Sequence, residues 1–560
     1  MQKELRLGVG MCALLLAPVT AQAQGRGGAE WTTSNGDAQR TSWIRTDPRI
    51  SVASMAKGAE GFGPFKFLWK LKVDADPRKP NPLTQPVLLD RIIGFRGFKS
   101  VAFVATNSGT VYAIDTDFGT GLWKVHLNYG ASLPPVTIGT AECPAGMTAT
   151  LTRPTALAIS AFGGGGFGGR GGRSGGGVGE AGRGAPSIYT AGQGRGGGAP
   201  PGLPATPGAA VPGSAAAAAQ AGRAGGPGGG GGRGQATGAP DAAYAIGNDG
   251  YVRALNVQSG WDVFPPVQFL PANTRPAGAI VVNDETTGFL YTVTTHGCAY
   301  TPDAVWAVDL ISPKKDVVSW DARGATIAGS AGPAFGRDGT IYVATRDGNS
   351  PLANSVVSLE PKTLKQKAVF TLAKADFVSA PIVIQYKDKD LVAVAAKDGR
   401  VFVLDGASLQ VPLAATPAAG EVTAEGLASW QDEKGTRWIL ATGSTSVVAH
   451  RLVEEGTGLA FQKGWTSRAL VAPLTPLVVN GVVFALSGGE EDQPGAAPRA
   501  ARSSSPAVLY ALDGASGKEI WTSAKTITAS ARGGLSAGAG VVYVPATDST
   551  LYAFGFPIEK

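Results

Sequence analysis

Cysteine and histidine are scarce in this chain of 560 residues, which contains three of each. The histidines, His126, His296 and His450, are scattered and lack the spacing of zinc ligands, so the sequence predicts no metal site. A CxxCH motif is missing, which excludes covalent haem attachment, and no two cysteines are adjacent. No motif therefore assigns a catalytic residue.

Long hydrophobic runs are missing as well, apart from a short one near the beginning. Residues 7–17 are apolar, follow Lys3 and Arg6, and precede a stretch of small residues. A membrane-spanning helix needs roughly 20 apolar residues, so we expect a cleaved signal peptide at residues 1–23 rather than a membrane anchor. The mature protein, residues 24–560, is then predicted to lack a transmembrane segment and to be periplasmic or secreted.

Two cysteines, Cys143 and Cys298, remain after the predicted signal. An oxidising compartment favours a disulfide between two such residues. The sequence leaves two alternatives open, a disulfide between them or two unpaired buried thiols.

Charged residues make up only 16% of the chain, and the net charge is +7. Most of the positive excess is local, because residues 163–240 contain six arginines and one glutamate. This Gly/Arg/Ala-rich segment has too few apolar side chains to offset ordering entropy, so we expect it to be a disordered surface insertion. A segment that binds anionic polymers is the alternative. The rest of the chain is nearly neutral, and we expect no nucleic-acid partner.

One segment recurs with fixed spacing. Residues 511–521, ALDGASGKEIW, and residues 113–123, AIDTDFGTGLW, place Ala, Asp, Gly and Trp at the same intervals, and residues 254–264, ALNVQSGWDVF, are a looser copy. The spacing indicates a strand, a tight turn and a second strand. We expect the Asp or Asn to accept bonds from turn amides, the Gly to adopt a positive φ, and the aromatic residue to pack. Strands with regular turns and little helical periodicity predict an all-β fold.

The two best copies resemble the repeat of PQQ-like, or quinoprotein-type, β-propellers. The positions that carry this resemblance are Ala113, Asp115, Gly119, Trp123, Ala511, Asp513, Gly517 and Trp521. The resemblance implies that each copy closes a four-stranded blade and that its Trp docks on the neighbouring blade. Residues 30–51 are also similar to the Trp, Gly-Asp and Thr segment that opens such propellers and lies against the propeller face.

The two ends of the chain complement one another. Residues 65–73 form a strand candidate without the three strands that normally precede it, whereas residues 534–556 supply three strands without a fourth. We expect both ends to complete one blade, which closes the ring and removes free sheet edges. The number of repeat units predicts a single β-propeller of eight four-stranded blades, with seven as the alternative. The insertion at 163–240 interrupts one blade.

The resemblance places the inner strand of each blade along a central channel where ligands bind. Charged residues near the beginning of these strands are candidate cofactor- or ligand-binding residues, namely Arg275, Glu425 and Arg532. The alternative is that these residues lie at strand ends in water or pair with each other.

A PQQ enzyme of this family needs arginines for the quinone, a calcium ion held by Glu, Asn and Asp oxygens, a catalytic Asp and a Trp beneath the ring. The sequence does not allow this set to be placed. We therefore expect a monomeric, non-catalytic binding or assembly scaffold of the cell envelope without a cofactor. Its partner would be an envelope protein or a small-molecule ligand at the propeller face. The alternative is a divergent PQQ- and calcium-dependent quinoprotein dehydrogenase that oxidises an alcohol or a sugar.

Overall fold

The computed structural model describes residues 30–58, 63–75, 82–94, 97–127, 143, 146–157, 239–283, 288–372, 376–418, 426–490 and 505–557. These residues all belong to one compact unit of the chain, Gly28–Ile159 together with Tyr189–Lys560. The predicted signal peptide, residues 1–23, lies outside the described residues, and so does the predicted insertion at 163–240 except for its last two residues. Both remain predictions.

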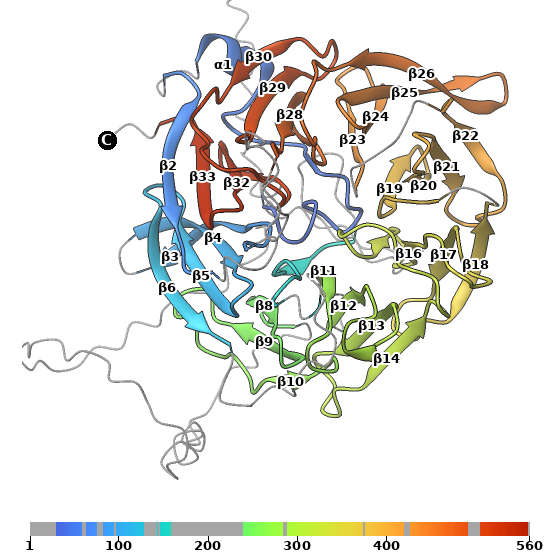
Figure 1. The fold of residues 1–560 in the computed structure, drawn as a ribbon, viewed down its shortest axis with the longest axis horizontal. Helices are drawn as coiled ribbons and strands as arrows, with labels where there is room; N and C mark the ends of the chain where they lie inside the picture. The colour runs from blue at the N-terminus through green and yellow to red at the C-terminus, as the bar shows by residue number, and fades with distance from the viewer. Residues whose placement is uncertain are drawn as a thin grey trace, which may run out of the picture. The chain divides into compact units, whose positions relative to one another are not determined.

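Eight sheets are arranged around a common centre and form the blades of a β-propeller (Figure 1). Blade 1 contains β3 (Val87–Gly94), β4 (Gly97–Ala105), β5 (Thr110–Asp115) and β6 (Thr120–His126). Blade 2 contains β8 (Ala243–Ile246), β9 (Tyr251–Leu255) and β10 (Val267–Gln268), and an antiparallel bridge joins Thr152 to Tyr244 of β8. Blade 3 contains β11 (Pro276–Asn283), β12 (Gly288–Thr294), β13 (Ala304–Asp309) and β14 (Val317–Asp321). Blade 4 contains β15 (Ala334–Phe335), β16 (Ile341–Ala344), β17 (Ser355–Leu359) and β18 (Gln366–Thr371).

The other four blades follow in chain order. Blade 5 contains β19 (Ile382–Tyr386), β20 (Lys389–Ala395), β21 (Val401–Asp405) and β22 (Pro412–Ala415). Blade 6 contains β23 (Ala428–Gln431), β24 (Arg437–Thr442), β25 (Val447–Glu455) and β26 (Gly458–Thr466). Blade 7 contains β27 (Leu477–Val479), β28 (Val482–Ser487), β29 (Val508–Asp513) and β30 (Glu519–Thr522). Blade 8 contains β31 (Ser536–Gly538), β32 (Val541–Pro545), β33 (Thr550–Gly555) and β2 (Lys66–Lys72). The prediction of an all-β propeller with eight blades is confirmed.

Both ends of the chain contribute strands to blade 8, as predicted. β2 lies antiparallel to β33, with Lys66 opposite Gly555 and Lys72 opposite Thr550. Two further short strands pair in parallel with inner strands: β1 (Trp43–Ile44) with β27, and β7 (Pro154–Thr155) with β11. The ring is therefore closed by an outer strand from the N-terminal part and three inner strands from the C-terminal part.

The first strand of each blade lies nearest the centre and the last lies at the rim (Figure 1). All six residues of β28 are buried because both faces of an inner sheet contact neighbouring blades, whereas β6 at the rim is largely half-buried or exposed. We call the side where the chain passes from one blade to the next the inter-blade face. The side where the first and second strands of a blade are joined is the hairpin face.

The hairpins of the repeat form as predicted. The side-chain Oδ1 of Asp513 accepts bonds from the backbone N–H groups of Ala515 and Ser516 at 3.1 and 2.8 Å, and Gly517 adopts a φ of +72°. Gly119 has the same left-handed backbone, with a φ of +66°. The turn residue types are therefore explained by local hydrogen bonding and by the positive φ.

Three docking tryptophans, Trp69, Trp123 and Trp465, pack on the turn glycine of the next blade, so the Gly and the Trp of one repeat act at different interfaces. A Cβ on Gly119 would lie 2.4 Å from the ring of Trp69, and one on Gly260 would lie 2.7 Å from Trp123. Nε1 of Trp69 also donates to Thr116 O at 2.8 Å. The predicted docking of Trp on the neighbouring blade is confirmed, but Trp69 and also Trp465, which packs on Gly517, were not singled out by the repeat pattern.

Trp521 docks in a different way because the blade after it is the closing one. Its ring packs edge-on against Phe65, with ring centroids 4.9 Å apart, and against Phe554 at 5.6 Å. A short helix, α1 (Val52–Lys57), precedes β2 and is capped by Ser51, whose Oγ accepts a bond from Ser54 N at 3.1 Å. Among the described residues no helix is long and apolar enough to cross a membrane.

Cys143 and Cys298 form a disulfide, which decides between the two alternatives left open by the sequence. Their Cα atoms are 5.5 Å apart, and 155 residues separate them in the chain. Cys298 begins a single 3-10 turn, Cys298–Tyr300, in the loop between β12 and β13 on the inter-blade face. The bridge therefore ties the segment before blade 2 to blade 3.

Candidate functional site

Residues 31–47, which we call the N-terminal strap, run along the inner strands of successive blades. The carbonyl groups of the strap accept hydrogen bonds of 2.8–2.9 Å from inner-strand N–H groups, in the pairs Trp31 with Leu88, Thr32 with Arg153, Ala38 with Phe335, Gln39 with Val383, Thr41 with Ser429, and Ser42 with Val478. Thr33 Oγ1 donates to Ala279 O of blade 3 at 2.6 Å, and Gly540 N of blade 8 donates to Asp47 Oδ2 at 2.8 Å. The strap is therefore hydrogen-bonded to all eight blades.

Arg40 is completely buried and joins the strap to two blades. Its guanidinium donates to four oxygens at 2.8–2.9 Å, namely Pro333 O, Gly278 O, Ser34 O and Thr33 Oγ1. Burial lowers the pKa of Arg40 to about 9, and the nearby Asp37 opposes this effect. Four of the five N–H donors of this guanidinium are thus used by the chain itself.

The negative charge of Asp37, also in the strap, acts on Arg40 and on Arg45. Its Oδ1 accepts a bond from Thr41 N at 2.8 Å, and Oδ2 accepts one from Thr41 Oγ1 at 2.5 Å. Burial raises the pKa of Asp37, whereas the positive charge of Arg45 and the bonds from Thr41 oppose the shift. The backbone of the strap is left-handed at Asn35 and Ser42, with a φ of 54° at each. The hydrogen bonds between the strap and the ring maintain this conformation.

Two of the three sequence-predicted candidates, Arg275 and Arg532, lie on the inter-blade face. Arg532 precedes β31 and donates to three backbone carbonyls, namely Gly488 O at 3.1 Å, Gly489 O at 3.0 Å and Ala531 O at 2.8 Å. These bonds hold the loop that follows β28, which gives the side chain a structural role.

Arg275 directly precedes β11 and is half-buried. Burial raises the pKa of the nearby Asp303. The hydrogen bonds from Ile327 N and Gly297 N and the positive charge of Arg275 oppose this shift. The third candidate, Glu425, lies outside the described residues.

A cluster that the sequence did not single out lies on the hairpin face, where the strap leaves the centre. The guanidinium carbon of Arg45 lies 4.4 Å from the ring centroid of Trp43, and that of Arg437 lies 5.5 Å from the same centroid. We call these three residues the arginine–tryptophan cluster. Trp43 is placed by its pairing with Val478 of blade 7, and Arg437 begins the second strand of blade 6.

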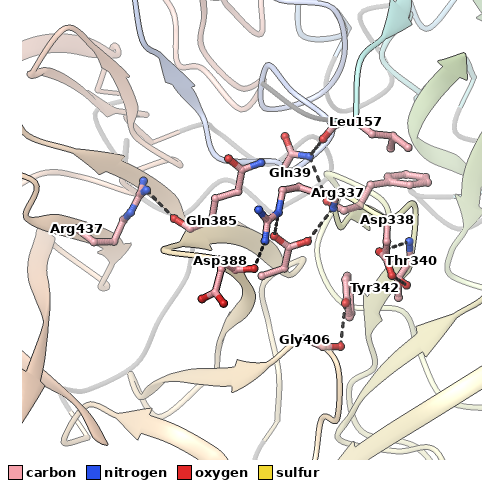
Figure 2. Close-up of polar contacts among 12 residues, drawn as sticks. Gln39, Leu157, Arg337, Asp338, Thr340, Tyr342, Gln385, Asp388, Gly406 and Arg437 are labelled. Atoms are coloured by element: carbon pink, nitrogen blue, oxygen red, sulfur yellow. Dashed lines mark hydrogen bonds and ion pairs between the residues drawn. The ribbon is translucent and has the colours of Figure 1, made fainter. Parts of the chain in front are cut away.

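Arg437 is anchored by one bond to the neighbouring blade. Its Nη2 donates to Gln385 O of blade 5 at 2.9 Å, a contact drawn in Figure 2, and to Gln431 Oε1 at 3.3 Å. Burial and the like charge of Arg45 lower the pKa of Arg437 to about 10. Burial also lowers the pKa of Arg45, with Asp37 opposing the shift. The two guanidiniums therefore share a partly buried region without a carboxylate within ion-pair distance among the described residues.

Arg337, also drawn in Figure 2, shows the opposite arrangement at the same end of blades 4 and 5. Its Nε donates to Asp390 Oδ1 at 2.7 Å, and its Nη2 donates to Asp388 O at 2.5 Å. Its charge is therefore paired across the blade interface. This contact explains Arg337 as a structural link and distinguishes it from the arginine–tryptophan cluster.

Metal-ligating side chains do not gather beside the strap in the part of the chain that the structure describes. No group of three or more His, Cys, Asp or Glu side chains there is placed to hold a metal ion. A cavity of about 10 Å³ lies between blades 1 and 8, and an open groove of about 520 Å³ lies at the rim beside Phe264 and Lys315. Neither hollow is lined by a strap residue.

The arginine–tryptophan cluster could not be predicted from the sequence, because its residues come from distant segments. Trp43 and Arg45 stand in the opening segment that resembles the start of quinoprotein propellers, but Arg437 stands in a blade whose repeat is degenerate. Only the path of the strap along the ring brings the three side chains together.

Comparisons with known proteins show similarity in fold but not in sequence. No family model and no curated protein matches the chain. Among solved structures, the quinohemoprotein alcohol dehydrogenase of Comamonas testosteroni matches with a TM-score of 0.51 and 12% identity, over 95% of this chain and 81% of that one. The quinohemoprotein alcohol dehydrogenase ADHIIG of Pseudomonas putida HK5 matches with a TM-score of 0.51 and 11% identity over the same shares. A europium-containing methanol dehydrogenase matches with a TM-score of 0.51 and 10% identity, over 95% of this chain and 99% of that one. The chain therefore has the PQQ-like, eight-bladed propeller fold of the quinoprotein dehydrogenases.

Proposed function

We propose that this chain is an exported propeller that acts as a non-catalytic binding or assembly scaffold in the cell envelope. The observation that carries the proposal is the N-terminal strap, which is hydrogen-bonded to all eight blades around the centre. A cofactor at the centre of a propeller must use inner-strand and loop groups as ligands. Here inner-strand N–H groups are bonded to strap carbonyls, and four of the five N–H donors of Arg40 are bonded to oxygens of the chain.

The second candidate is a divergent PQQ- and calcium-dependent dehydrogenase that oxidises an alcohol or a sugar. The similarity in fold to three dehydrogenases favours it. A calcium ion needs several converging hard oxygen ligands, and no three His, Cys, Asp or Glu side chains of the described residues are grouped to hold a metal ion. Arg532, one of the described cationic candidates, is used by backbone carbonyls. These two observations support the scaffold over the dehydrogenase.

The test is a titration of the purified protein, without residues 1–23, with PQQ and calcium. Quinone absorbance and the melting temperature are followed together, and an apo-quinoprotein dehydrogenase serves as the positive control. The scaffold predicts no spectral change and no rise in melting temperature at saturating PQQ. Tight, calcium-dependent binding would contradict it and would support the dehydrogenase.

A further inference from the structure

We propose that the arginine–tryptophan cluster, Trp43, Arg45 and Arg437, binds a small oxyanion, the phosphate or carboxylate group of a soluble ligand. This inference concerns the hairpin face and does not depend on the role proposed for the protein as a whole. Positive and negative charges do not balance in this region. Three guanidiniums, those of Arg40, Arg45 and Arg437, and one carboxylate, that of Asp37, act electrostatically on one another here. The other carboxylate of the strap, Asp47, accepts hydrogen bonds from the backbone N–H groups of Arg49, Ile50 and Gly540.

The single carboxylate does not neutralise the cluster. One carboxylate oxygen of Asp37 accepts a hydrogen bond from Thr41 N, and the other accepts one from Thr41 Oγ1. Asp37 forms no ion pair with Arg45 or Arg437 within 4 Å. Two positive charges therefore remain in excess in a region that is largely removed from water. An unpaired buried charge is costly, and an anion bound between the guanidiniums removes that cost.

Two donor atoms of the cluster are unused. Nη1 of Arg45 and Nε of Arg437 are buried and have no hydrogen-bond partner among the described residues. Three other arginines with an unbonded buried Nε have a carboxylate partner: Arg153 pairs with Glu30 and Asp241, Arg253 with Asp249, and Arg346 with Asp376. Arg451, which lies over Trp438, has an unbonded Nε and no ion pair among the described residues. The cluster differs from Arg451 because it brings two guanidiniums with unbonded donors to one aromatic ring, that of Trp43.

Part of the cluster lies at the surface, although its two unused donor atoms are themselves buried. Arg437 is only 6% exposed, but Trp43, Arg45 and Gln385 are half-buried, and Gln431 is exposed. Their side chains come from the strap and from the hairpin ends of blades 5 and 6. A ligand therefore approaches along the hairpin face, with Arg437 at the base of the site.

The chemistry of the donors selects the ligand class. A guanidinium presents planar N–H pairs that match the oxygens of a carboxylate or a phosphate, and it remains charged at neutral pH. The face of Trp43 is already used by the two cations, so the indole orients the guanidiniums rather than a ligand ring. These features favour a compact oxyanion over an aromatic or neutral ligand.

The experiment is calorimetric titration of the full mature chain with inorganic phosphate and, separately, with succinate. The ionic strength is held constant with sodium chloride, so that chloride reports non-specific screening. The expected result is one saturable site for phosphate or for succinate, and the difference between the two arms identifies a tetrahedral or a planar oxyanion. Arg437→Gln and Arg45→Gln should each weaken this binding by at least about tenfold, since each removes a charged hydrogen-bond donor.

The matched control is Arg468→Gln. Arg468 also lies over an aromatic ring, 4.7 Å from the centroid of Tyr510, but its Nη1 is paired with Glu519 at 2.7 Å. This variant should bind the oxyanion like the wild type. If Arg437→Gln does not fold, the half-buried Arg45→Gln is the informative variant, and its melting curve confirms folding.

Three results would overturn the proposal. They are the lack of a saturable site for either oxyanion, unchanged binding in both Arg437→Gln and Arg45→Gln, and an equal loss of binding in Arg468→Gln.

Discussion

Replacing Gly119 by alanine places a methyl group where the docking tryptophan of the closing blade lies. The new Cβ would stand 2.4 Å from Cδ2 of Trp69, and Gly119 has a φ of +66°. The left-handed backbone costs an alanine roughly 1–2 kcal/mol. Displacing a packed indole costs about 1–3 kcal/mol more, and the bond from Trp69 Nε1 to Thr116 O at 2.8 Å is weakened as well. We expect Gly119→Ala to lower the free energy of unfolding by about 2–5 kcal/mol.

Two other glycines separate the backbone cost from the contact. Gly456 has a φ of +59°, and a Cβ at this position would have no neighbour within 4 Å, so Gly456→Ala should cost only the roughly 1–2 kcal/mol of the left-handed conformation. Gly121 has neither a positive φ nor a close neighbour. Gly121→Ala should therefore be neutral or stabilising by up to about 1 kcal/mol.

The assay is urea denaturation of the three variants, followed by tryptophan fluorescence and far-ultraviolet circular dichroism. The expected order of destabilisation is Gly119→Ala, then Gly456→Ala, then Gly121→Ala. Equal values for Gly119→Ala and Gly456→Ala would refute the reasoning, because the contact with Trp69 would then contribute nothing to the closure of the ring.

Two further predictions concern acid stability and the disulfide. Burial, helped by Lys463, lowers the pKa of His450, so its stabilising contribution is complete above the unfolded pKa of about 6.5 and is lost as the pH falls through the lower folded value. The loss of unfolding free energy on acidification should be smaller in His450→Phe than in the wild type, and identical pH profiles would contradict this. Replacing Cys143 and Cys298 by serine opens a loop of 155 residues and should cost about 2–5 kcal/mol. Thiol titration of the unreduced, unfolded wild type should find no reactive thiol from this pair, and finding both would show that the bridge does not form.

The parts of the fold that could be predicted from the sequence are those fixed by local chemistry. Asp513 and Gly517 satisfy a turn within a few residues, and that requirement is visible in the spacing of the repeat. The closure of blade 8 was also predictable, because a lone strand at one end and three strands at the other can remove their free edges by pairing.

What the sequence did not indicate depends on contacts between distant segments. Trp69 and Trp465 dock on glycines of other blades and lack an Asp-Gly turn of their own, so the repeat pattern missed them. The arginine–tryptophan cluster likewise combines Trp43 and Arg45 of the strap with Arg437 of blade 6. Whether Cys143 and Cys298 pair could not be decided either, because the spacing of two cysteines does not report the geometry of a ring.

The N-terminal strap bonds to inner-strand N–H groups that a ligand at the centre of the ring would otherwise use. Hydrogen–deuterium exchange of the native protein can be resolved to the amides of Leu88, Phe335, Val383 and Ser429. We expect these amides to be protected as strongly as those of the second strands, because each donates to a strap carbonyl at 2.8–2.9 Å. Exchange at the rate of loop amides, with the rest of each blade still protected, would show instead that the inner ring is open to a ligand.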